Sequence, residues 1–291
     1  MSALSTHEQL TGEVIGDKWL LSNDFKESTS GKSYIYKAFR RNVSGNPQGD
    51  PVIIKISPNT EALERESQNY DTIGDNNESN LFVAVLDYLP EADPTTAKFQ
   101  DKGAIVMERG TQDLKSFIQD NGPLEGKQLQ ETAENTARCV EAVHDRNMVW
   151  TEIKAENFVV AEDGTSVKGI DLESAVHVME NPIDYSLEAV PPEFAVAFLC
   201  GREPFMEMEQ SFDVWSLGML LYELATGKHY FEDKQECKVQ IATTLKNIEQ
   251  VNLDTEQMDS QLKDLIHQCL TIKPEQRPNL QQVLEHNFFL R

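Results

Sequence analysis

Two short segments in the C-terminal half of the chain place ionisable and amide side chains at close spacing. The segment WTEIKAEN carries Glu152, Lys154 and Asn157, and the segment IDLE that follows carries Asp171. Carboxylate and amide oxygens are the hard donors that Mg²⁺ requires when it bridges two phosphate groups. Because IDLE alone would be an ordinary strand end, the metal-binding interpretation rests on the two segments together.

A second pair of charged residues lies in the N-terminal half. Lys55 ends the apolar run VIIK, and Glu66 follows in the helix-forming stretch ALERES. A strand lysine and a helix glutamate are each usually solvated. Their joint spacing favours a functional pair, and Glu64 is the alternative acid if the helix register is shifted.

Several familiar binding motifs are excluded by spacing. The stretch STSGKS at 28–33 resembles a Walker A loop, but position 26 is Lys and not the required Gly. The four cysteines are far apart, without a CxxC pair or a histidine cluster: Cys139, Cys200, Cys237 and Cys269. They predict neither a zinc site nor a disulfide framework, and they suit a reducing compartment.

The composition limits the kinds of partner that we expect for this protein. The 291 residues include 26 Lys and Arg against 49 Asp and Glu, giving a formal charge of −23. Such a field repels nucleic acid and anionic membranes, whereas a basic protein partner, or simply a solvated acidic surface, is compatible with it. There is no membrane-spanning apolar run and no signal-peptide pattern at the start, so we expect a cytoplasmic protein without membrane insertion. The oligomeric state cannot be inferred.

The elements that must position these residues change in character along the chain. Short β-branched and aromatic runs predict strands at 19–25, 33–39, 51–57, 81–89 and 104–108, with an exposed hairpin loop at 40–50 and one helix at 58–74 capped by Thr60. From about Thr111 helical periodicity dominates. It predicts helices near 127–146, 211–227, 260–270 and 279–289, with the second of these buried all round.

The order of five motifs resembles the eukaryotic protein kinase family across nearly the whole chain. The motifs are IKAENFVV, KGIDLESA, PPE, FDVWSLGMLLYELATG and CLTIKPEQRPNLQQVLEHNFF. The resemblance implies an α+β protein kinase-like fold that forms one catalytic-type domain. Its small β-rich N-lobe would cover residues 1–108 and its large α-helical C-lobe residues 109–291.

The resemblance also implies roles for the charged residues. Lys55 would contact the α- and β-phosphates of ATP, and Glu66 would position that lysine. Asn157 and Asp171 would be the ligands of Mg²⁺, with Mn²⁺ as an alternative ion. Lys154 would contact the transferred phosphate, as in the serine/threonine branch of the family.

The nucleotide pocket and a structural ion pair follow from the same resemblance. Met107 falls at the gatekeeper position, backbone groups of Glu108 and Gly110 would bind adenine, and Asp113 would meet the ribose. Ile53 replaces the usual alanine over the ring. Ile35 and Val159 complete the predicted lining of the pocket. Glu193 and Arg277 match a buried ion pair of the large lobe.

The most consequential departure from the family pattern is in the catalytic loop, where HRD is replaced by Trp150, Thr151 and Glu152. Glu152 keeps the carboxylate but is one methylene longer, and a misplacement of about 1 Å can cost on the order of 10²-fold in rate. Losing the arginine removes the usual receiver of an activation-loop phosphate. Only three residues between 171 and 193 could be phosphorylated, so loop switching is not expected: Ser174, Tyr185 and Ser186.

Three further departures concern the phosphate loop, the metal segment and the core. Ser28, Ser30 and Ser33 stand where three glycines usually let the backbone approach phosphates. DFG is replaced by a segment that includes Glu173. Trp150 and Leu172 both fall in the internal column of stacked side chains, where a large and a small residue would conserve the packed volume.

Two hypotheses of different class remain open. The first is a serine/threonine-type protein kinase that uses Mg-ATP, with Glu152 and Lys154 as catalytic residues and a protein substrate; Glu156 lies where related kinases contact a basic substrate residue. The second is a pseudokinase that holds nucleotide or acts as a scaffold without phosphotransfer. Phosphorylation of a small molecule is disfavoured, because the closing helices resemble those of protein kinases.

Overall fold

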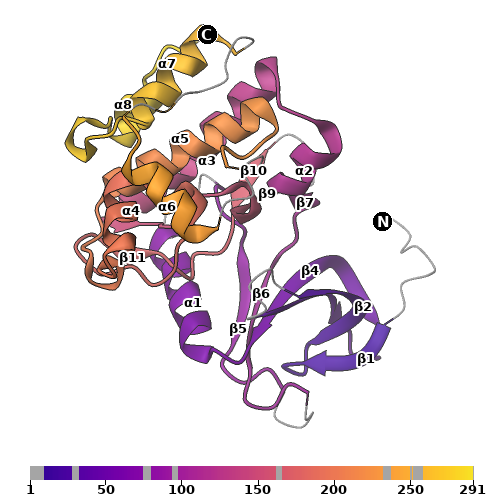
Figure 1. The fold of residues 1–291 in the computed structure, drawn as a ribbon. Helices are drawn as coiled ribbons and strands as arrows, with labels where there is room; N and C mark the ends of the chain where they lie inside the picture. Colours follow the sequence, from indigo (N-terminus) through magenta and orange to yellow (C-terminus); the bar gives the residue numbers. More distant parts are fainter. Residues whose placement is uncertain are drawn as a thin grey trace. The chain divides into compact units, whose positions relative to one another are not determined.

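The computed structural model describes residues 10–27, 33–74, 80–93, 98–161, 166–231, 237–249, 251 and 258–290. Ser28 and Ser30, two of the predicted phosphate-loop serines, lie outside the described residues. The chain forms two compact units (Figure 1): Met1–Asp71 with Val83–Arg109, and Thr72–Phe82 with Gly110–Arg291. A strand-rich N-terminal region is followed by a helical C-terminal region, as the sequence predicts. The lobe boundary at 108/109 stays a prediction.

The N-terminal unit is built on one antiparallel sheet with the strand order β1-β2-β3-β4-β6-β5. Its strands are β1 Leu10–Ile15, β2 Trp19–Glu27, β3 Tyr34–Arg41, β4 Pro47–Ser57, β5 Val85–Leu89 and β6 Gly103–Glu108, and it includes helix α1 Thr60–Gly74 up to Asp71. The short β1 was not predicted. Strands β3 and β4 extend into the predicted loop, which therefore shrinks to residues 42–46, where the Asn42 side chain accepts hydrogen bonds from two amides.

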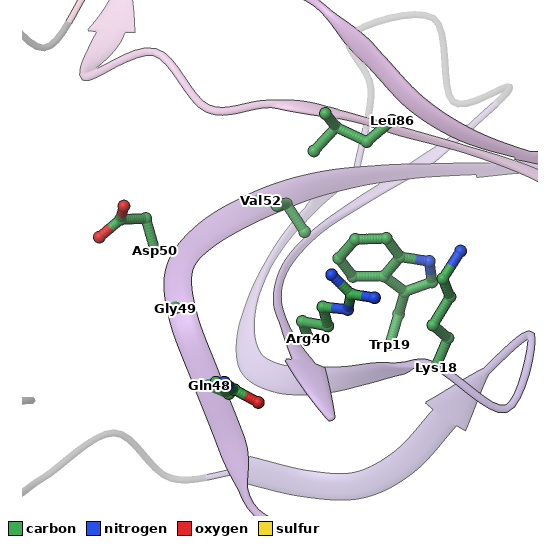
Figure 2. A pocket seen from close by; sticks show the side chains of 8 residues that line it. All are labelled: Lys18, Trp19, Arg40, Gln48, Gly49, Asp50, Val52 and Leu86. Carbon is green, nitrogen blue, oxygen red and sulfur yellow. The ribbon is translucent and has the colours of Figure 1, made fainter. Parts of the chain in front are cut away.

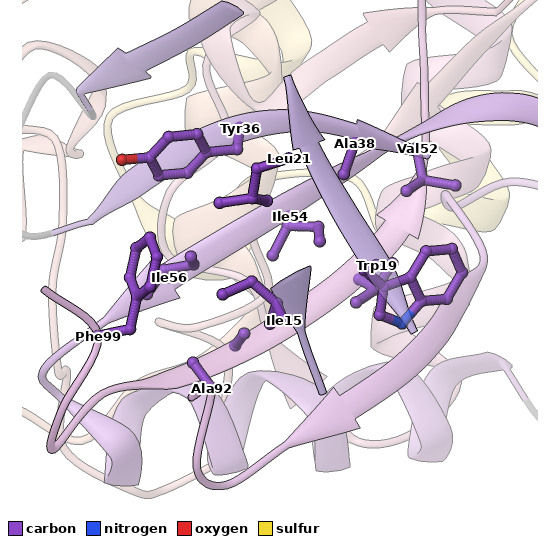
Figure 3. Close-up of a cluster of buried hydrophobic side chains, with 12 residues drawn as sticks. Ile15, Trp19, Leu21, Tyr36, Ala38, Val52, Ile54, Ile56, Ala92 and Phe99 are labelled. Atoms are coloured by element: carbon purple, nitrogen blue, oxygen red, sulfur yellow. The ribbon is translucent and has the colours of Figure 1, made fainter. Parts of the chain in front are cut away.

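The two faces of this sheet differ because strand side chains alternate. One face of β3 and β4 carries Tyr36, Ala38, Ile54 and Ile56, which are buried in an apolar cluster that Phe99 also joins. Figure 3 shows these side chains gathered on one side of the strands. The opposite face of the same strands carries Ile35, Ile53 and Lys55.

Helix α1 begins at Thr60, but its cap differs from the prediction. The Asn59 side chain accepts a hydrogen bond from the Ala62 amide at 3.1 Å, so Asn59 and not Thr60 is the capping residue. Thr60 is the first residue with helical geometry. The predicted helix itself is present.

The C-terminal unit is mostly helical, with two small sheets of order β10-β9-β7 and β11-β8. Its helices are α2 Leu114–Asn121, α3 Gly126–His144, α4 Pro192–Leu199, α5 Gln210–Thr226, α6 Lys238–Lys246, α7 Ser260–Cys269 and α8 Leu280–Leu284, and its strands are β7 Gln112–Asp113, β8 Met148–Val149, β9 Phe158–Val160, β10 Val167–Gly169 and β11 Val176–His177. Short 3₁₀ turns lie at Ala155–Asn157, Leu187–Ala189, Glu203–Phe205 and Pro274–Gln276.

The two central helices have the predicted burial. One face of α3 is buried, and α5 is buried on nearly every side; the apolar residues on that face of α3 are Leu129, Ala133, Ala137, Val140 and Val143. The predicted helix at 279–289 is shorter, since α8 ends at Leu284. No helix in the described part of the chain combines the length and apolar character needed to cross a membrane.

The predicted ion pair of this unit is confirmed. Both terminal nitrogens of Arg277 donate to the Glu193 carboxylate, at 2.7 and 2.8 Å. The same guanidinium donates to three backbone carbonyls and lies 5.1 Å from the centre of the Trp215 ring. The two parallel hydrogen bonds between the guanidinium and the carboxylate connect α4 to the segment before α8.

The four cysteines carry free thiols, as expected. Cys139 and Cys269 are fully buried, and burial raises the pKa of each thiol to about 12. Cys200 and Cys237 are exposed.

The large Trp150 side chain has space in the core because a neighbour lacks a side chain. Trp150 and Leu172 are both fully buried, and the indole packs against Phe82 and Phe158 at ring-centre distances of 5.5 and 5.2 Å. A Cβ added to Gly169 would come within 2.9 Å of the indole and 2.5 Å of the Phe82 ring. Gly169 therefore accommodates the indole, while volume compensation by Leu172 stays a prediction.

We predict that Gly169→Ala lowers the free energy of unfolding by about 1–3 kcal/mol, because the new methyl group overpacks this site. Trp150→Phe removes the part of the indole nearest the glycine, so the double variant should be more stable than the sum of the single effects by about 1 kcal/mol. Denaturant unfolding of the four proteins measures this coupling.

The matched control is Gly74→Ala at the end of α1, where an added Cβ meets nothing within 4 Å. Strictly additive effects of the Gly169 and Trp150 substitutions would contradict the proposed packing relationship.

Candidate active site

The loop that carries Glu152 is anchored to α5 by one buried carboxylate. The Oδ2 atom of Asp213 accepts a hydrogen bond from the Trp150 amide at 2.7 Å, and Oδ1 accepts one from the Thr151 amide at 2.9 Å. The His144 ring lies 3.0 Å from Oδ2. Asp213 is fully buried, so these partners stabilise a charge that would otherwise be costly to bury.

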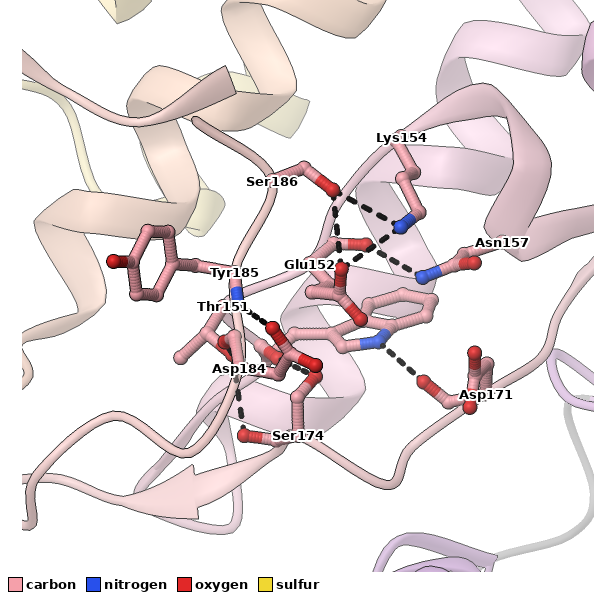
Figure 4. Close-up of polar contacts among 10 residues, drawn as sticks. Thr151, Glu152, Lys154, Asn157, Asp171, Ser174, Asp184, Tyr185 and Ser186 are labelled. Atoms are coloured by element: carbon pink, nitrogen blue, oxygen red, sulfur yellow. Dashed lines mark hydrogen bonds and ion pairs between the residues drawn. The ribbon is translucent and has the colours of Figure 1, made fainter. Parts of the chain in front are cut away.

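The Glu152 side chain is held by two donors, as Figure 4 shows. The Lys154 ammonium donates to Oε1 at 2.8 Å and the Ser186 hydroxyl donates to the same oxygen at 3.0 Å. Lys154 also donates to the Ser186 hydroxyl oxygen at 3.0 Å. Oε2 of Glu152 forms no hydrogen bond with another described residue, so it can accept a proton or hydrogen bond from a ligand hydroxyl.

The charge of Lys154 is reinforced by the acids around it. Burial alone would lower its pKa, but the attraction of Glu152, the hydrogen bond to it, and the more distant charges of Asp171 and Glu156 outweigh burial and raise the pKa. A raised pKa keeps the ammonium protonated throughout the neutral range. Lys154 is therefore a fixed cation beside the carboxylate.

Asn157 and Asp171 lie at adjoining ends of two paired strands. Asn157 immediately precedes β9, and Asp171 lies two residues after the end of β10; the Ile170 amide donates to the Asn157 carbonyl at 2.9 Å. The Asn157 side-chain nitrogen donates to the Glu152 carbonyl at 2.9 Å, which directs its Oδ1 away from that bond. An amide oxygen and a neighbouring carboxylate are a donor set that fits a divalent hard cation.

Within the N-terminal unit, the predicted lysine and glutamate form a buried ion pair. The Lys55 ammonium lies 2.8 Å from Glu66 Oε2, and their side chains are 9% and 1% exposed. Glu64, the alternative acid, is exposed and interacts with Gln68 at 3.4 Å. Glu66, and not Glu64, is therefore the partner of Lys55.

Three of the predicted pocket residues share a sheet face with Lys55. Ile35 pairs with Lys55 across β3 and β4, and Ile53 pairs with Met107 across β4 and β6. These positions point away from the apolar cluster, and Ile35 and Ile53 are only half-buried. A face that carries apolar side chains, the buried Lys55 and the half-buried Lys37 suits a ligand that joins an aromatic base to phosphate groups.

The environment of Glu108 restricts its predicted role. Its amide donates to the Ala84 carbonyl at 2.8 Å, and its carboxylate accepts a bond from the Ala84 amide at 3.2 Å. The Glu108 amide is thus already engaged, and a nucleotide contact would have to use its carbonyl oxygen.

Lys37 on the same unit has a lowered pKa, mainly through burial and secondarily through the positive charge of Arg109.

The remaining predicted pocket residues belong to the C-terminal unit. A Cβ at Gly110 would lie 2.7 Å from the Val159 Cβ, so the two backbones approach closely and only glycine fits without a shift. Asp113 caps α2, with one carboxylate oxygen accepting from the Ser116 amide and the other from the Ser116 hydroxyl, both at 2.8 Å. Capping accounts for Asp113 structurally, and its predicted ribose contact stays a prediction.

A separate open pocket of about 340 Å³ lies on the N-terminal unit. Figure 2 shows its lining by Lys18, Trp19, Arg40, Gln48, Gly49, Asp50, Val52 and Leu86. None of these is a predicted site residue. Two side chains of this pocket donate hydrogen bonds to the Asp87 carboxylate, the Trp19 indole at 3.0 Å and the Lys18 ammonium at 2.7 Å. Burial alone would raise the pKa of Asp87, but the bonds to Lys18 and Trp19 outweigh burial and lower it.

The sequence analysis did not anticipate the roles of two residues that hold the loop around Glu152. Asp213 had a readable signal, since an acid within the apolar run FDVWSLGMLL implies a buried carboxylate with partners. Ser186 had no such signal, because it contacts Glu152 across 34 residues and lies in an irregular segment.

The sequence was compared with those of known proteins. Residues 48–289 match the model of the protein kinase domain. The chain is 30% identical over 175 residues to putative sperm motility kinase W of Mus musculus, covering 60% of this chain and 33% of that protein. It is 28% identical over 191 residues to serine/threonine-protein kinase pim-2 of Danio rerio, covering 64% and 56%. It is 29% identical over 159 residues to the Aurora kinase of Schizosaccharomyces pombe, covering 53% and 41%.

These matches span between a third and just over half of each relative's length. The domain match, in contrast, covers most of the present chain, including the β4 lysine, the catalytic-type loop and the closing helices. The chain therefore belongs to the protein kinase family.

Proposed function

We propose that this protein transfers the γ-phosphate of ATP to a serine or threonine hydroxyl of a protein substrate. The observation that carries the proposal is the Glu152 carboxylate, which Lys154 and Ser186 hold through Oε1 while Oε2 stays available. In this family a carboxylate at this position orients the attacking hydroxyl. The extra methylene of glutamate makes such fixation necessary, because a longer side chain has more orientations to lose.

The proposed roles divide between substrate orientation and charge stabilisation. Glu152 Oε2 would accept the hydrogen bond of the acceptor hydroxyl and finally its proton, as the hydroxyl oxygen bonds to the γ-phosphorus and the bond to the ADP leaving group breaks. Lys154, a fixed cation, would contact the transferred phosphoryl group. Asn157 Oδ1 and the Asp171 carboxylate would hold magnesium or manganese ions, which when bound neutralise charge on the phosphates.

The remaining proposed roles concern the nucleotide. Lys55 would pair with the α- and β-phosphates. Its ammonium is held in position by the ion pair with Glu66. The adenine and ribose would contact Ile35, Ile53, Met107, Glu108, Gly110, Asp113 and Val159. The Glu108 contact would be made by its carbonyl, since its amide is engaged.

The charge distribution favours a basic substrate. The C-terminal unit contains 15 Lys and Arg but 34 Asp and Glu, so it carries −19 of the formal charge of −23. Glu156, beside the catalytic-type loop, is exposed. A substrate segment rich in Lys or Arg would be attracted to this unit, and the attraction would weaken with added salt. The matched relatives that are named as serine/threonine kinases agree with a hydroxyl acceptor.

A nucleotide-binding module without phosphotransfer is the second candidate. The Lys55–Glu66 pair that would hold the phosphates is independent of Glu152, so nucleotide binding could persist if the longer carboxylate fails to orient a hydroxyl. Measurements of binding and of transfer separate the two candidates.

For phosphotransfer, we predict that the wild-type protein labels a generic basic protein in the presence of ATP and Mg²⁺ or Mn²⁺. Glu152→Gln keeps the size but not the basicity of the side chain, and should lower kcat by about 10²-fold or more. Asp171→Asn should lower it comparably by weakening metal binding. Radiolabel transfer under initial-rate conditions measures both effects.

The isosteric control is Glu275→Gln, which changes an exposed glutamate far along the chain and should leave the rate unchanged. Labelling that survives both active-site substitutions would dismiss the catalytic assignment of Glu152 and Asp171.

For nucleotide binding, we predict that Mg-ATP raises the melting temperature of the wild-type protein, because a ligand that binds only the native state stabilises it. Lys55→Met should abolish most of this increase, whereas Glu152→Gln should retain it. Lys127→Met, at a lysine whose side chain is 83% exposed, is the matched control. Differential scanning fluorimetry with and without Mg-ATP provides the comparison, and an equal increase in the Lys55 variant would refute the assigned phosphate contact.

A further inference from the structure

Thr151 adopts a backbone conformation that its side chain disfavours. Its φ is +68°, a region where a β-branched residue is a genuine outlier, and the residue is only 2% exposed. Such strain persists only where surrounding contacts determine it, and it often accompanies a functional constraint. The amide of Thr151 is one such contact, since it is held by Asp213 at 2.9 Å.

The side chain of Thr151 reaches two separate parts of the chain. Its hydroxyl lies 3.1 Å from the Ser174 carbonyl and 3.0 Å from the Asp184 carbonyl, so its one proton is shared between them. Ser174 returns a bond, because its own hydroxyl donates to the Trp150 carbonyl at 3.2 Å. Figure 4 shows Thr151, Ser174 and Asp184 close to one another.

These contacts connect Thr151 to the candidate catalytic carboxylate. Asp184 lies two residues before Ser186, whose hydroxyl donates to Glu152. On the other side, the Trp150 indole donates to the Asp171 carbonyl at 3.2 Å, three residues before Ser174. Loss of the Thr151 hydroxyl would therefore loosen the segment that places Ser186 against Glu152.

We propose that Thr151 is a positioning residue that keeps the segment 174–186 ordered, and thereby Ser186 in contact with Glu152, without any covalent modification of that segment. Its catalytic consequence rests on the proposed kinase function, whereas the ordering itself does not. The contact is between neutral groups, and the sequence has no Lys or Arg from Leu172 to Gly201. An ordering device of this kind should be insensitive to ionic strength, unlike one based on a phosphate and a cation.

The test compares Thr151→Val with Thr151→Ser. Valine keeps the β-branched shape and its backbone strain but removes the donor, whereas serine restores the donor. In Thr151→Val, hydrogen–deuterium exchange of peptides covering 174–188 should accelerate by about fivefold, the change expected when a hydrogen bond near 1 kcal/mol is lost. Thr151→Ser should exchange at nearly the wild-type rate, and added salt should change neither result.

The matched control is Thr136→Val, which deletes another buried threonine hydroxyl, in α3, that donates to the Ala133 carbonyl at 2.9 Å. This control should lower global stability to a similar extent without selective acceleration at 174–188. A merely structural role of Thr151 would give the pattern of the control.

Steady-state kinetics of phosphotransfer provide the second readout. The protein used is first shown to be unphosphorylated by intact-mass measurement. Thr151→Val should lower kcat on the order of tenfold, with KM for ATP nearly unchanged, and serine should restore kcat. If the wild type shows no transfer, the proposed kinase function fails and exchange alone decides the ordering. Unchanged exchange in Thr151→Val, equal local acceleration in Thr136→Val, or lack of rescue by serine would overturn the proposal.

Discussion

The buried carboxylate of Asp213 determines the geometry of the catalytic-type loop. It accepts hydrogen bonds from two successive amides, those of Trp150 and Thr151, and has the His144 ring as a third partner. A buried carboxylate without such donors would be strongly destabilising, so α5 and the loop hold one another in place. Two consecutive amides can point at one group only if the backbone turns sharply, which accounts for the positive φ of Thr151.

The loop contributes only backbone amides to this anchor, so the anchor does not depend on the side chains of Trp150 and Thr151. Trp150 and Thr151, which the resemblance aligns with the histidine and arginine of the family's HRD motif, both donate their amides to Asp213. The replaced side chains make different contacts: the indole fills space beside Gly169 and binds the Asp171 carbonyl, and the threonine hydroxyl binds two further carbonyls. The two amide bonds to Asp213 therefore leave the side chains at positions 150 and 151 free to make contacts of their own.

The sequence predicted those features that depend on local periodicity or on an ordered series of motifs. The strands around Lys55, the burial of α3 and α5, and the Glu193–Arg277 pair follow from apolar spacing and from motifs with fixed separations. The short strand β1 and the Asn59 cap were missed, because six residues of mixed polarity and a one-residue shift of a cap leave little pattern. The contacts of Thr151 and Ser186 could not be predicted from the sequence, because they join irregular segments 23–34 positions apart.

The longer carboxylate makes these irregular contacts important. Compared with aspartate, glutamate has one more torsion to fix, at a cost that two donors on a single oxygen can offset. One of those donors, Lys154, belongs to the same loop, but the other, Ser186, comes from a segment whose position depends on Thr151. Because Thr151 is in turn oriented by Asp213, the direction of the Glu152 side chain is set by a continuous series of short contacts that begins in the core of the C-terminal unit. A substitution along this series would therefore alter the carboxylate without touching it.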